Sequence, residues 1–261
     1  MSRNGQRSTN PEDYQHVARA VAAMPKDFAA GFEIVPHHHA RAQLIHATAG
    51  TMRVSTADGV WVVPPQRALW MPAGVTHSIV MLSDTTMRTL YVRGDAAAAM
   101  PTVCRVLSVS PLLRELIVRA TELPLDYDEH GPAGHVVALI IAELRGLQSL
   151  PLQLPMPSDP RLRALCQALL YAPGDQRTLD EWAATLNASA RTLARHFQSE
   201  TGLSFGAWRQ QARVLEAMGR LGNGAPVTQV ALDLGYDSVS AFSAMFRRAA
   251  GASPSAYRHR P

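Results

Sequence analysis

The chain has 261 residues, 47% of them hydrophobic and 18% charged, with a formal net charge of +4. This composition is typical of a globular protein with material for one or two cores. No apolar run reaches about 18 residues, and the N-terminal segment MSRNGQRSTNPEDYQHVARA lacks the apolar core of a signal peptide, so we expect a cytoplasmic protein without a membrane partner. Cys104 and Cys166 lie far apart in apolar contexts, which favours reduced, buried thiols.

Positive charge is concentrated in the last hundred residues. Residues 1–158 hold 13 Lys and Arg against 13 Asp and Glu, whereas residues 159–261 hold 12 against 8, and all 12 bases there are Arg. Arginine suits bidentate contact with phosphates and guanine edges, although a solvated helix face has the same composition. Nucleic acid is therefore a candidate partner for the C-terminal half.

Residues 32–93 have the pattern of an all-β module. TMRVSTADGVWVV contains two β-rich runs around Asp58-Gly59, a strong hairpin signal, and prolines and glycines punctuate the chain after it. Within this module, Gly31 is followed after five residues by His37-His38-His39, then by Gln43 and Gly50, and PAGVTH occupies residues 72–77. The two stretches resemble the two motifs of the cupin family, which implies a small β-barrel.

The histidines of this module form a candidate binding site. On a strand, His37 and His39 would share one face while His38 points away, and His77 could join them from another strand. In metal-binding cupins, such histidines and a glutamate hold a transition metal, but Gln43 stands where that glutamate is expected and Met81 where the second motif has asparagine. Three alternatives stay open for His37, His39, Gln43 and His77: a divalent transition metal, a metal-free effector pocket, or a structural remnant. We expect His46 and His38 to face elsewhere.

Helices and a linker come after the β-module. Ser110-Pro111 predicts the start of a helix over LLRELIVRATEL, and AGHVVALIIAELRGL predicts a second helix apolar enough to support dimerisation. QSLPLQLPMPSDP, with four prolines in thirteen residues, is typical of a linker.

The C-terminal half contains an internal repeat. Leu193, Phe197, Gly202 and Ser204 recur 49 residues later as Phe242, Phe246, Gly251 and Ser253. Each copy has the sequence pattern of a short helix, a turn and a second helix. The turn is expected at Asn187 in the first copy and at Gly235 in the second, because both residue types tolerate a left-handed backbone.

The outward face of each second helix is the candidate DNA-contacting surface. The first helix presents arginines at i and i+4, which can reach guanine edges or phosphates, and the second presents mostly serine and alanine. With the residues that precede the helices, the set is Ser189, Arg191, Ala194, Arg195, Ser238, Ser240, Ser243, Ala244 and Arg247. GAWRQQARVLEAMGRLGNG predicts a helix of about 15 residues that could place the two second helices in successive major grooves.

The last hundred residues resemble the DNA-binding domain of the AraC/XylS family of transcription regulators, and ALDLGYDSVSAFSAMFRRAAGASPSAYR matches its signature stretch nearly throughout. The resemblance implies paired helix-turn-helix subdomains, with base contacts from the positions of Arg191, Ala194 and Arg195, and of Ser240, Ser243 and Ala244. It departs at Ala194 and Ala244, where many members carry larger polar side chains.

The sequence thus predicts an α+β protein with two folded domains. We expect a cupin-like, jelly-roll type barrel over residues 12–95, helices and a Pro-rich linker over 96–158, and an all-α DNA-binding domain over 159–261. The function expected is regulation of transcription at double-stranded promoter DNA by a homodimer, with an effector or metal in the barrel. Activation, with RNA polymerase as a partner, is favoured over repression. The rival hypothesis is a cupin-type metalloenzyme, a dioxygenase or isomerase with a fused helical domain.

Overall fold

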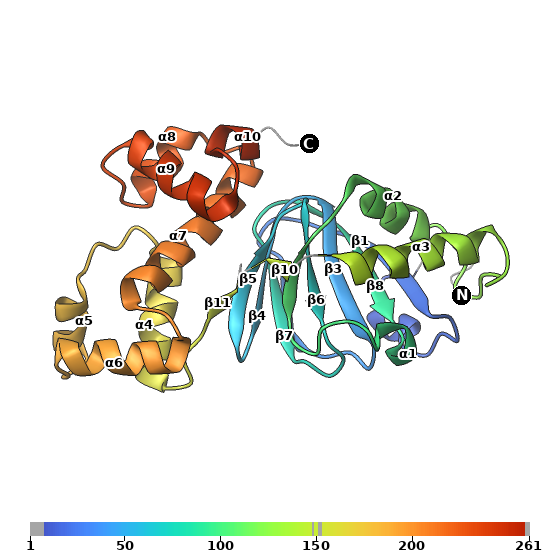
Figure 1. The fold of residues 1–261 in the computed structure, drawn as a ribbon, viewed down its shortest axis with the longest axis horizontal. Helices are drawn as coiled ribbons and strands as arrows, with labels where there is room; N and C mark the ends of the chain where they lie inside the picture. The colour runs from blue at the N-terminus through green and yellow to red at the C-terminus, as the bar shows by residue number, and fades with distance from the viewer. Residues whose placement is uncertain (1–7, 148, 151–152, 259–261) are drawn as a thin grey trace. The chain divides into compact units, whose positions relative to one another are not determined.

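A computed structural model describes residues 8–147, 149–150 and 153–258. Contacts between Cα atoms divide the chain into two compact units, residues 1–56 with 63–151 and residues 57–62 with 152–261. Figure 1 gives the labels of the helices and strands used below. An all-β part with two sheets and a C-terminal helical part are present, as the sequence predicted.

The first sheet has six antiparallel strands in the order β1-β8-β3-β6-β9-β10. Their bounds are Val21–Phe28 (β1), Ala42–Ala49 (β3), Arg67–Met71 (β6), Thr85–Val92 (β8), Arg105–Ser108 (β9) and Ser149–Leu150 (β10). The 3-10 helix η1 (Pro11–Tyr14) precedes β1 along the chain, and the short helix α1 (Gly94–Ala97) follows β8.

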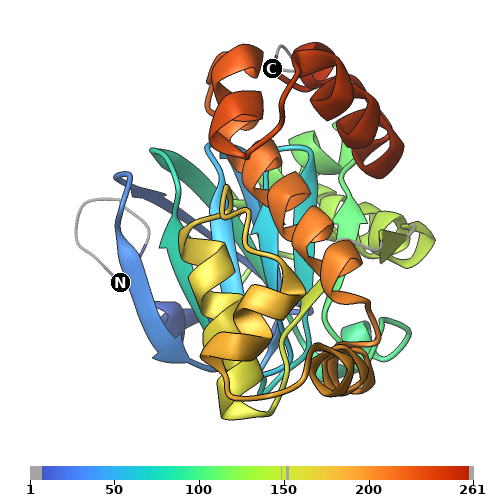
Figure 2. The ribbon, with the colours of Figure 1, turned by 90° about the vertical axis from the view of Figure 1, so that its left-hand side faces the viewer.

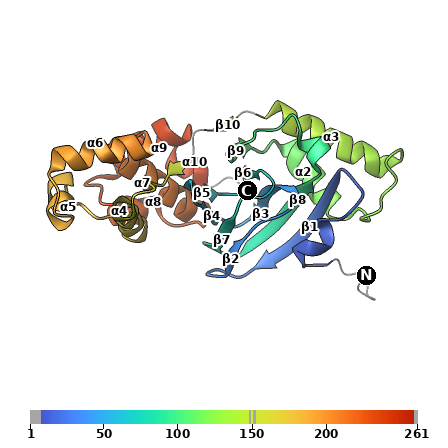
Figure 3. The same ribbon diagram turned by 90° about the horizontal axis from the view of Figure 1, so that it is seen from below.

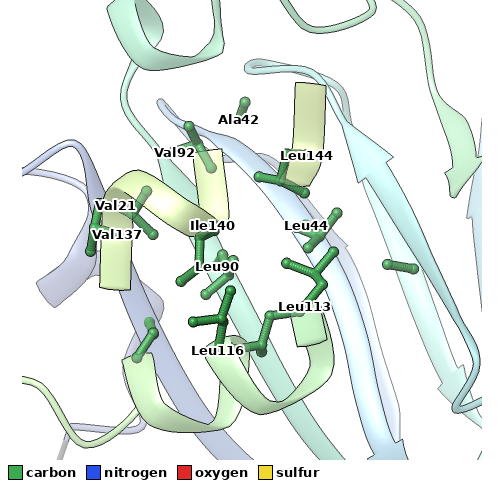
Figure 4. Packing of buried hydrophobic residues seen from close by; sticks show 14 of the residues in the cluster. Val21, Ala42, Leu44, Leu90, Val92, Leu113, Leu116, Val137, Ile140 and Leu144 are labelled. Carbon is green, nitrogen blue, oxygen red and sulfur yellow. The ribbon is translucent and has the colours of Figure 1, made fainter. Parts of the chain in front are cut away.

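Helices α2 (Pro111–Ala120) and α3 (Pro132–Gly146) cover one face of this sheet (Figure 3). Ser110 caps α2 by accepting a hydrogen bond from the Leu113 amide, as the Ser-Pro signal predicted. Side chains on the helix-covered face of the sheet, such as those of Leu44 and Leu90, pack with Leu113 and Ile140 in a common core (Figure 4). Because side chains alternate along a strand, the neighbouring residues, including Gln43 and Tyr91, point to the opposite face, toward the space between the two sheets.

The second sheet has five strands in the order β11-β5-β4-β7-β2. Their bounds are Glu33–His37 (β2), Met52–Thr56 (β4), Gly59–Val63 (β5), His77–Met81 (β7) and Leu154–Pro155 (β11). Gly50, between β3 and β4, has φ +82°, and a Cβ there would lie 2.2 Å from the Asp84 carbonyl oxygen. Only glycine meets both conditions, which accounts for a glycine at this position of the motif.

The Pro-rich stretch expected to be a linker contains β10 and β11. β10 pairs with β9, and β11 pairs with β5 through Leu154 and Val60. Residues 148 and 151–152 of that stretch lie outside the described residues.

The C-terminal helical unit contains α4 to α10. Their bounds are Pro160–Tyr171 (α4), Leu179–Thr185 (α5), Ala190–Thr201 (α6), Phe205–Gly222 (α7), Val227–Asp233 (α8), Val239–Ala250 (α9) and Pro254–Arg258 (α10). The pair α5 and α6 lies at one end of α7 and the pair α8 and α9 at the other (Figures 1 and 2). Among the described residues, no helix is both long and apolar enough to cross a membrane.

Candidate functional site: a histidine pocket and two recognition helices

A pocket of about 390 Å³ lies between the two sheets of the N-terminal unit. Its volume is in the range that holds a small organic molecule. Most of its wall is apolar, with Met24, Phe28, Ile34, Ile79 and Met87 among the lining residues. Its polar part contains His37, His38, His39, Gln43 and Tyr91.

Three of the predicted site residues, His37, His39 and His77, form one cluster. The ring centroids are 4.8 Å apart for His37 and His39, 4.3 Å for His37 and His77, and 5.6 Å for His39 and His77. One ligand nitrogen from each ring lies within 4.8 Å of the others. His39 and His77 are buried, and His37 is half-buried.

The backbone brings the cluster together differently from the sequence prediction. β2 ends at His37, and its pairing with β7 is irregular between Ile34 and His37, so His39 lies beyond the strand. His77 is the first residue of β7 and pairs directly with His37. His39 follows in the segment after β2, and its ring lies next to that of His37.

Backbone carbonyls orient two of the three rings. His37 Nδ1 lies 2.8 Å from the Val35 oxygen, and His77 Nδ1 lies 2.9 Å from the Val75 oxygen. Because a carbonyl oxygen can only accept, Nδ1 is the protonated nitrogen, and Nε2 retains its lone pair. His77 Nε2 and both ring nitrogens of His39 are buried without a hydrogen-bond partner among the described residues.

Burial keeps two of these imidazoles neutral. It lowers the pKa of His39 to about 4, and the neighbouring His37 and His77 contribute to that lowering. Burial likewise lowers the pKa of His77 to about 4, against the opposing effect of the hydrogen bond to Val75. Near pH 7 both side chains are lone-pair donors rather than cations.

Gln43 belongs to the same pocket. It lies on β3 opposite Tyr91 of β8, and its side chain hydrogen-bonds to the Tyr91 hydroxyl. Its Oε1 is buried without a partner among the described residues. Burial raises the pKa of Tyr91, so the hydroxyl stays protonated. Three imidazoles and one amide oxygen are ligand types that suit a divalent transition metal.

The two remaining histidines of the motif stand apart from the cluster. His38 is exposed. His46 is buried on the helix-covered face of its sheet, and its Nδ1 lies 3.0 Å from the Arg67 oxygen.

In the C-terminal unit, both predicted repeats form a helix, a turn and a second helix. Thr178 and Glu181 form a reciprocal capping box at the start of α5. The turn before α6 contains Asn187 with φ +51°, and the turn before α9 contains Gly235 with φ +75°. Both residues adopt the left-handed conformation that the sequence predicted.

The predicted DNA-contacting residues lie on or at the start of α6 and α9. Ser189 and Ser238 cap the two helices through the amides of Thr192 and Ala241. Leu193, Phe197, Phe242 and Phe246 are buried. The opposite faces are open to solvent, with Ala194 and Ser243 half-buried and these residues exposed: Ser189, Arg191, Arg195, Ser238, Ser240, Ala244 and Arg247.

One contact between the two motifs escaped the sequence analysis. Arg213 on α7 is buried, and its guanidinium donates to the carbonyl oxygens of Pro173 and Asp175, at 2.9 and 3.0 Å. The same guanidinium lies over the Tyr236 ring, just after the second turn. Gln176 donates to the Gly235 oxygen at 2.6 Å. The available sequence signal was an arginine within the largely apolar stretch ARVLEAM of the predicted spacer helix, because a charge at such a position needs a partner.

Gly174 completes this contact, which we call the inter-motif clamp (Gly174, Gln176, Arg213, Gly235 and Tyr236). A Cβ at Gly174 would lie 2.3 Å from the Asp233 carbonyl oxygen. The loop before α5 therefore packs backbone to backbone against the turn after α8. This packing joins the loop that precedes the first motif to the end of the first helix of the second motif.

A small-molecule pocket in an all-β domain and two helix-turn-helix motifs in a helical domain define a ligand-binding, DNA-binding regulator. Two family models match the chain: an AraC-like ligand binding domain over residues 29–172 and a helix-turn-helix domain over residues 182–260. The HTH-type transcriptional regulator NimR of Escherichia coli K12 is 35% identical over 221 residues, 85% of this chain and 81% of that protein. The chain belongs to the AraC family of transcription regulators.

Two further likenesses are more distant. The HTH-type transcriptional activator RhaR of Escherichia coli O1:K1 is 27% identical over 48% of this chain and 44% of that protein. The structure of ToxT from Vibrio cholerae covers 92% of this chain and 98% of its own, at 9% identity and a TM-score of 0.39. Membership of a regulator family decides against the cupin-type metalloenzyme.

Proposed function

We propose that this protein activates transcription by inserting α6 and α9 into successive major grooves of promoter DNA, under the control of a small molecule in the N-terminal pocket. The observation that carries this proposal is the pair of exposed recognition helices at the two ends of α7. An 18-residue helix is about 27 Å long, comparable to the roughly 34 Å between major grooves.

The proposed base-reading residues are Arg191, Ala194 and Arg195 on α6, and Ser240, Ser243 and Ala244 on α9. Ser189, Ser238 and Arg247 would contact the sugar-phosphate backbone. Ser189 and Ser238 each accept a hydrogen bond from one amide at the start of their helices. The other amides of the first turn would be available to donate to a DNA phosphate. On this proposal α6 supplies most of the sequence specificity, because its arginines can bond guanine in two places.

The test is sequencing of genomic fragments bound by the purified full-length protein. Wild type should enrich a common sequence, and Arg195→Ala should weaken binding to it by about 1–3 kcal/mol, roughly five- to 150-fold. Arg105→Ala, which removes an exposed arginine from β9, should leave operator binding unchanged. No enriched sequence with any compound tested, or equal loss in both variants, would reject the proposal.

Activation is inferred from the family resemblance, and transcription with purified RNA polymerase on the enriched fragments checks it. The expected result is more transcript in the presence of the regulator. A fall in transcript would identify a repressor instead.

We also propose a homodimer formed through α2 and α3. Leu112 and Leu139 are 52% and 50% exposed on these helices, so this apolar surface is not covered by the part of the chain that the structure describes. Sedimentation of wild type should give a dimer, and Leu139→Glu should give a monomer. A monomeric wild type would contradict the proposal.

A further inference from the structure

His39 and Gln43 line the pocket, and His77 adjoins it through its ring contacts with His37 and His39. His39 and His77 are 4% and 1% exposed, and Gln43 is 2% exposed. His77 Nε2, both nitrogens of His39 and Gln43 Oε1 are buried without a hydrogen-bond partner among the described residues. Each unpartnered group costs free energy unless something binds it.

A cation or a proton donor would satisfy His77 Nε2, Gln43 Oε1 and the unprotonated nitrogen of His39. The other nitrogen of the neutral His39 ring is itself a donor. The carbonyl contacts of His37 and His77 leave Nε2 as an acceptor, and an amide oxygen is also an acceptor. The three imidazoles lie within 4.8 Å of one another, close enough for one ion to contact all of them after small ring rotations. A second observation is the near-complete burial of His39 and His77, whose unpartnered nitrogens belong to this cluster. Imidazole nitrogens at this spacing favour a divalent transition metal.

Charge balance then defines the remaining ligand. Three neutral imidazoles and a neutral amide leave the whole +2 charge of such an ion uncompensated in a buried setting, which is unfavourable. The carboxylates that line the pocket, Glu12 and Glu33, are both solvent-exposed, and Lys26 lines it as well. An anionic group from the effector would supply the missing charge.

The rest of the pocket defines the body of that effector. Phe28, Ile34 and Met87 line it, and Phe32 and Val35 keep 49% and 67% of their surface exposed. An apolar or aromatic body is the complement of such a wall.

The geometry points to a metal-dependent sensor, in which His37, His39 and His77 hold a divalent transition metal that recruits an anionic chelating effector with an apolar body. Gln43 is the residue that makes the site depend on this anion, because a carboxylate there would satisfy the metal alone. The inference rests on the proposed function only in calling the ligand an effector.

The first measurement is calorimetric titration of zinc into full-length protein that was purified without an affinity tag and stripped with chelator. Wild type should bind one zinc per chain. His37→Ala, at a half-buried position, should bind it at least about tenfold more weakly, and His130→Ala, which removes an exposed histidine that does not line the pocket, should match wild type. Equal zinc affinity in all three proteins, or no binding by wild type, overturns the metal site.

The second measurement tests the anion with benzohydroxamate, a chelating anion with an aromatic body, and benzamide, its neutral, non-chelating analogue. Benzohydroxamate should bind zinc-loaded protein at least tenfold more tightly than stripped protein, and benzamide should show no such difference. Gln43→Glu should bind zinc more tightly and benzohydroxamate more weakly than wild type. Equal benzohydroxamate affinity with and without zinc, or in Gln43→Glu and wild type, overturns the anion requirement.

Binding to the enriched DNA is measured on the same preparations. A wild-type protein that binds the enriched DNA normally but binds no zinc overturns this inference and leaves the proposed function standing. Zinc and benzohydroxamate binding without sequence-specific DNA binding would reject the proposed function and support the site.

Discussion

The two functional regions carry polar groups that have no partner among the described residues, but they do so in opposite environments. In the N-terminal pocket these groups are buried imidazoles with lowered pKa values. On α6 they are the exposed guanidinium groups of Arg191 and Arg195, while the ion pairs described in this unit engage Arg161, Arg177 and Arg220. Burial disfavours the charged form of the imidazoles, so acid should change the stability of the N-terminal unit. The exposed guanidinium groups act through charge that salt screens, so salt should change DNA binding by α6 and α9.

Acid should give the largest difference between the two regions, and His46 offers a clean test of it. Burial lowers its pKa to about 4, and the nearby Arg114 adds to this, while the Arg67 carbonyl opposes it. The unfolded chain takes up the proton near pH 6.5 and the folded protein only near pH 4. Folding stability is therefore unaffected above pH 6.5, falls through this window, and has lost about 3 kcal/mol at pH 4.

The measurement is urea unfolding of metal-free protein at pH 7 and pH 5, with amide hydrogen exchange reporting each unit. His46→Asn keeps a donor for the Arg67 oxygen, so its N-terminal unit should lose less stability between the two pH values than that of wild type. The C-terminal unit should change little, because its carboxyl groups with lowered pKa values, such as those of Asp175 and Glu181, take up protons only below pH 5. An identical pH response in both proteins would contradict the role given to His46.

The inter-motif clamp sets the next largest effect. The Cβ of Gly174→Ala would lie 2.3 Å from a backbone oxygen, so the two motifs must shift apart. Overpacking of this kind costs about 1–3 kcal/mol, and we expect operator affinity to fall roughly tenfold while α6 and α9 stay folded. Gly206→Ala is the control, because its Cβ meets nothing within 4 Å and alanine favours the helix. Equal operator affinity in both variants would show that the clamp does not position the motifs.

These regions also differ in how well the sequence predicted them. The helical repeat was legible because helix caps, turn residues and apolar spacing are local signals, as Thr178, Asn187 and Gly235 show. His37, His39 and His77 were singled out by motif spacing, but the end of β2 at His37, which leaves His39 outside the strand, was not predicted, because strand ends depend on pairing with a distant segment. β10 and β11 were not predicted, because each is only two residues long and lies in a proline-rich stretch. Their partners, β9 and β5, are also far away in the sequence.

A smaller effect separates the two helix-turn-helix motifs. The first begins with the capping box of Thr178, whereas Pro226 at the start of α8 offers no side-chain cap. Thr178→Ala should destabilise α5 by about 1 kcal/mol, seen as faster amide exchange in α5 and α6 alone. Thr185→Ala, which removes a hydroxyl bonded to the Glu181 carbonyl within the same helix, should be neutral or stabilising. Equal exchange in the two variants would remove the capping box as a difference between the motifs.

Salt gives the smallest effect and separates α6 from α9. Arg247 is exposed on the last turn of α9, away from the helix start that would meet base edges, so a phosphate contact is its expected role. Arg247→Ala should weaken binding to operator and unrelated DNA by the same few-fold factor and reduce the slope of log affinity against log salt by about one. Arg195→Ala should instead weaken operator binding selectively. If Arg247→Ala were the variant that lost discrimination between the two DNAs, sequence reading would extend to α9, and the assignment of specificity mainly to α6 would be wrong.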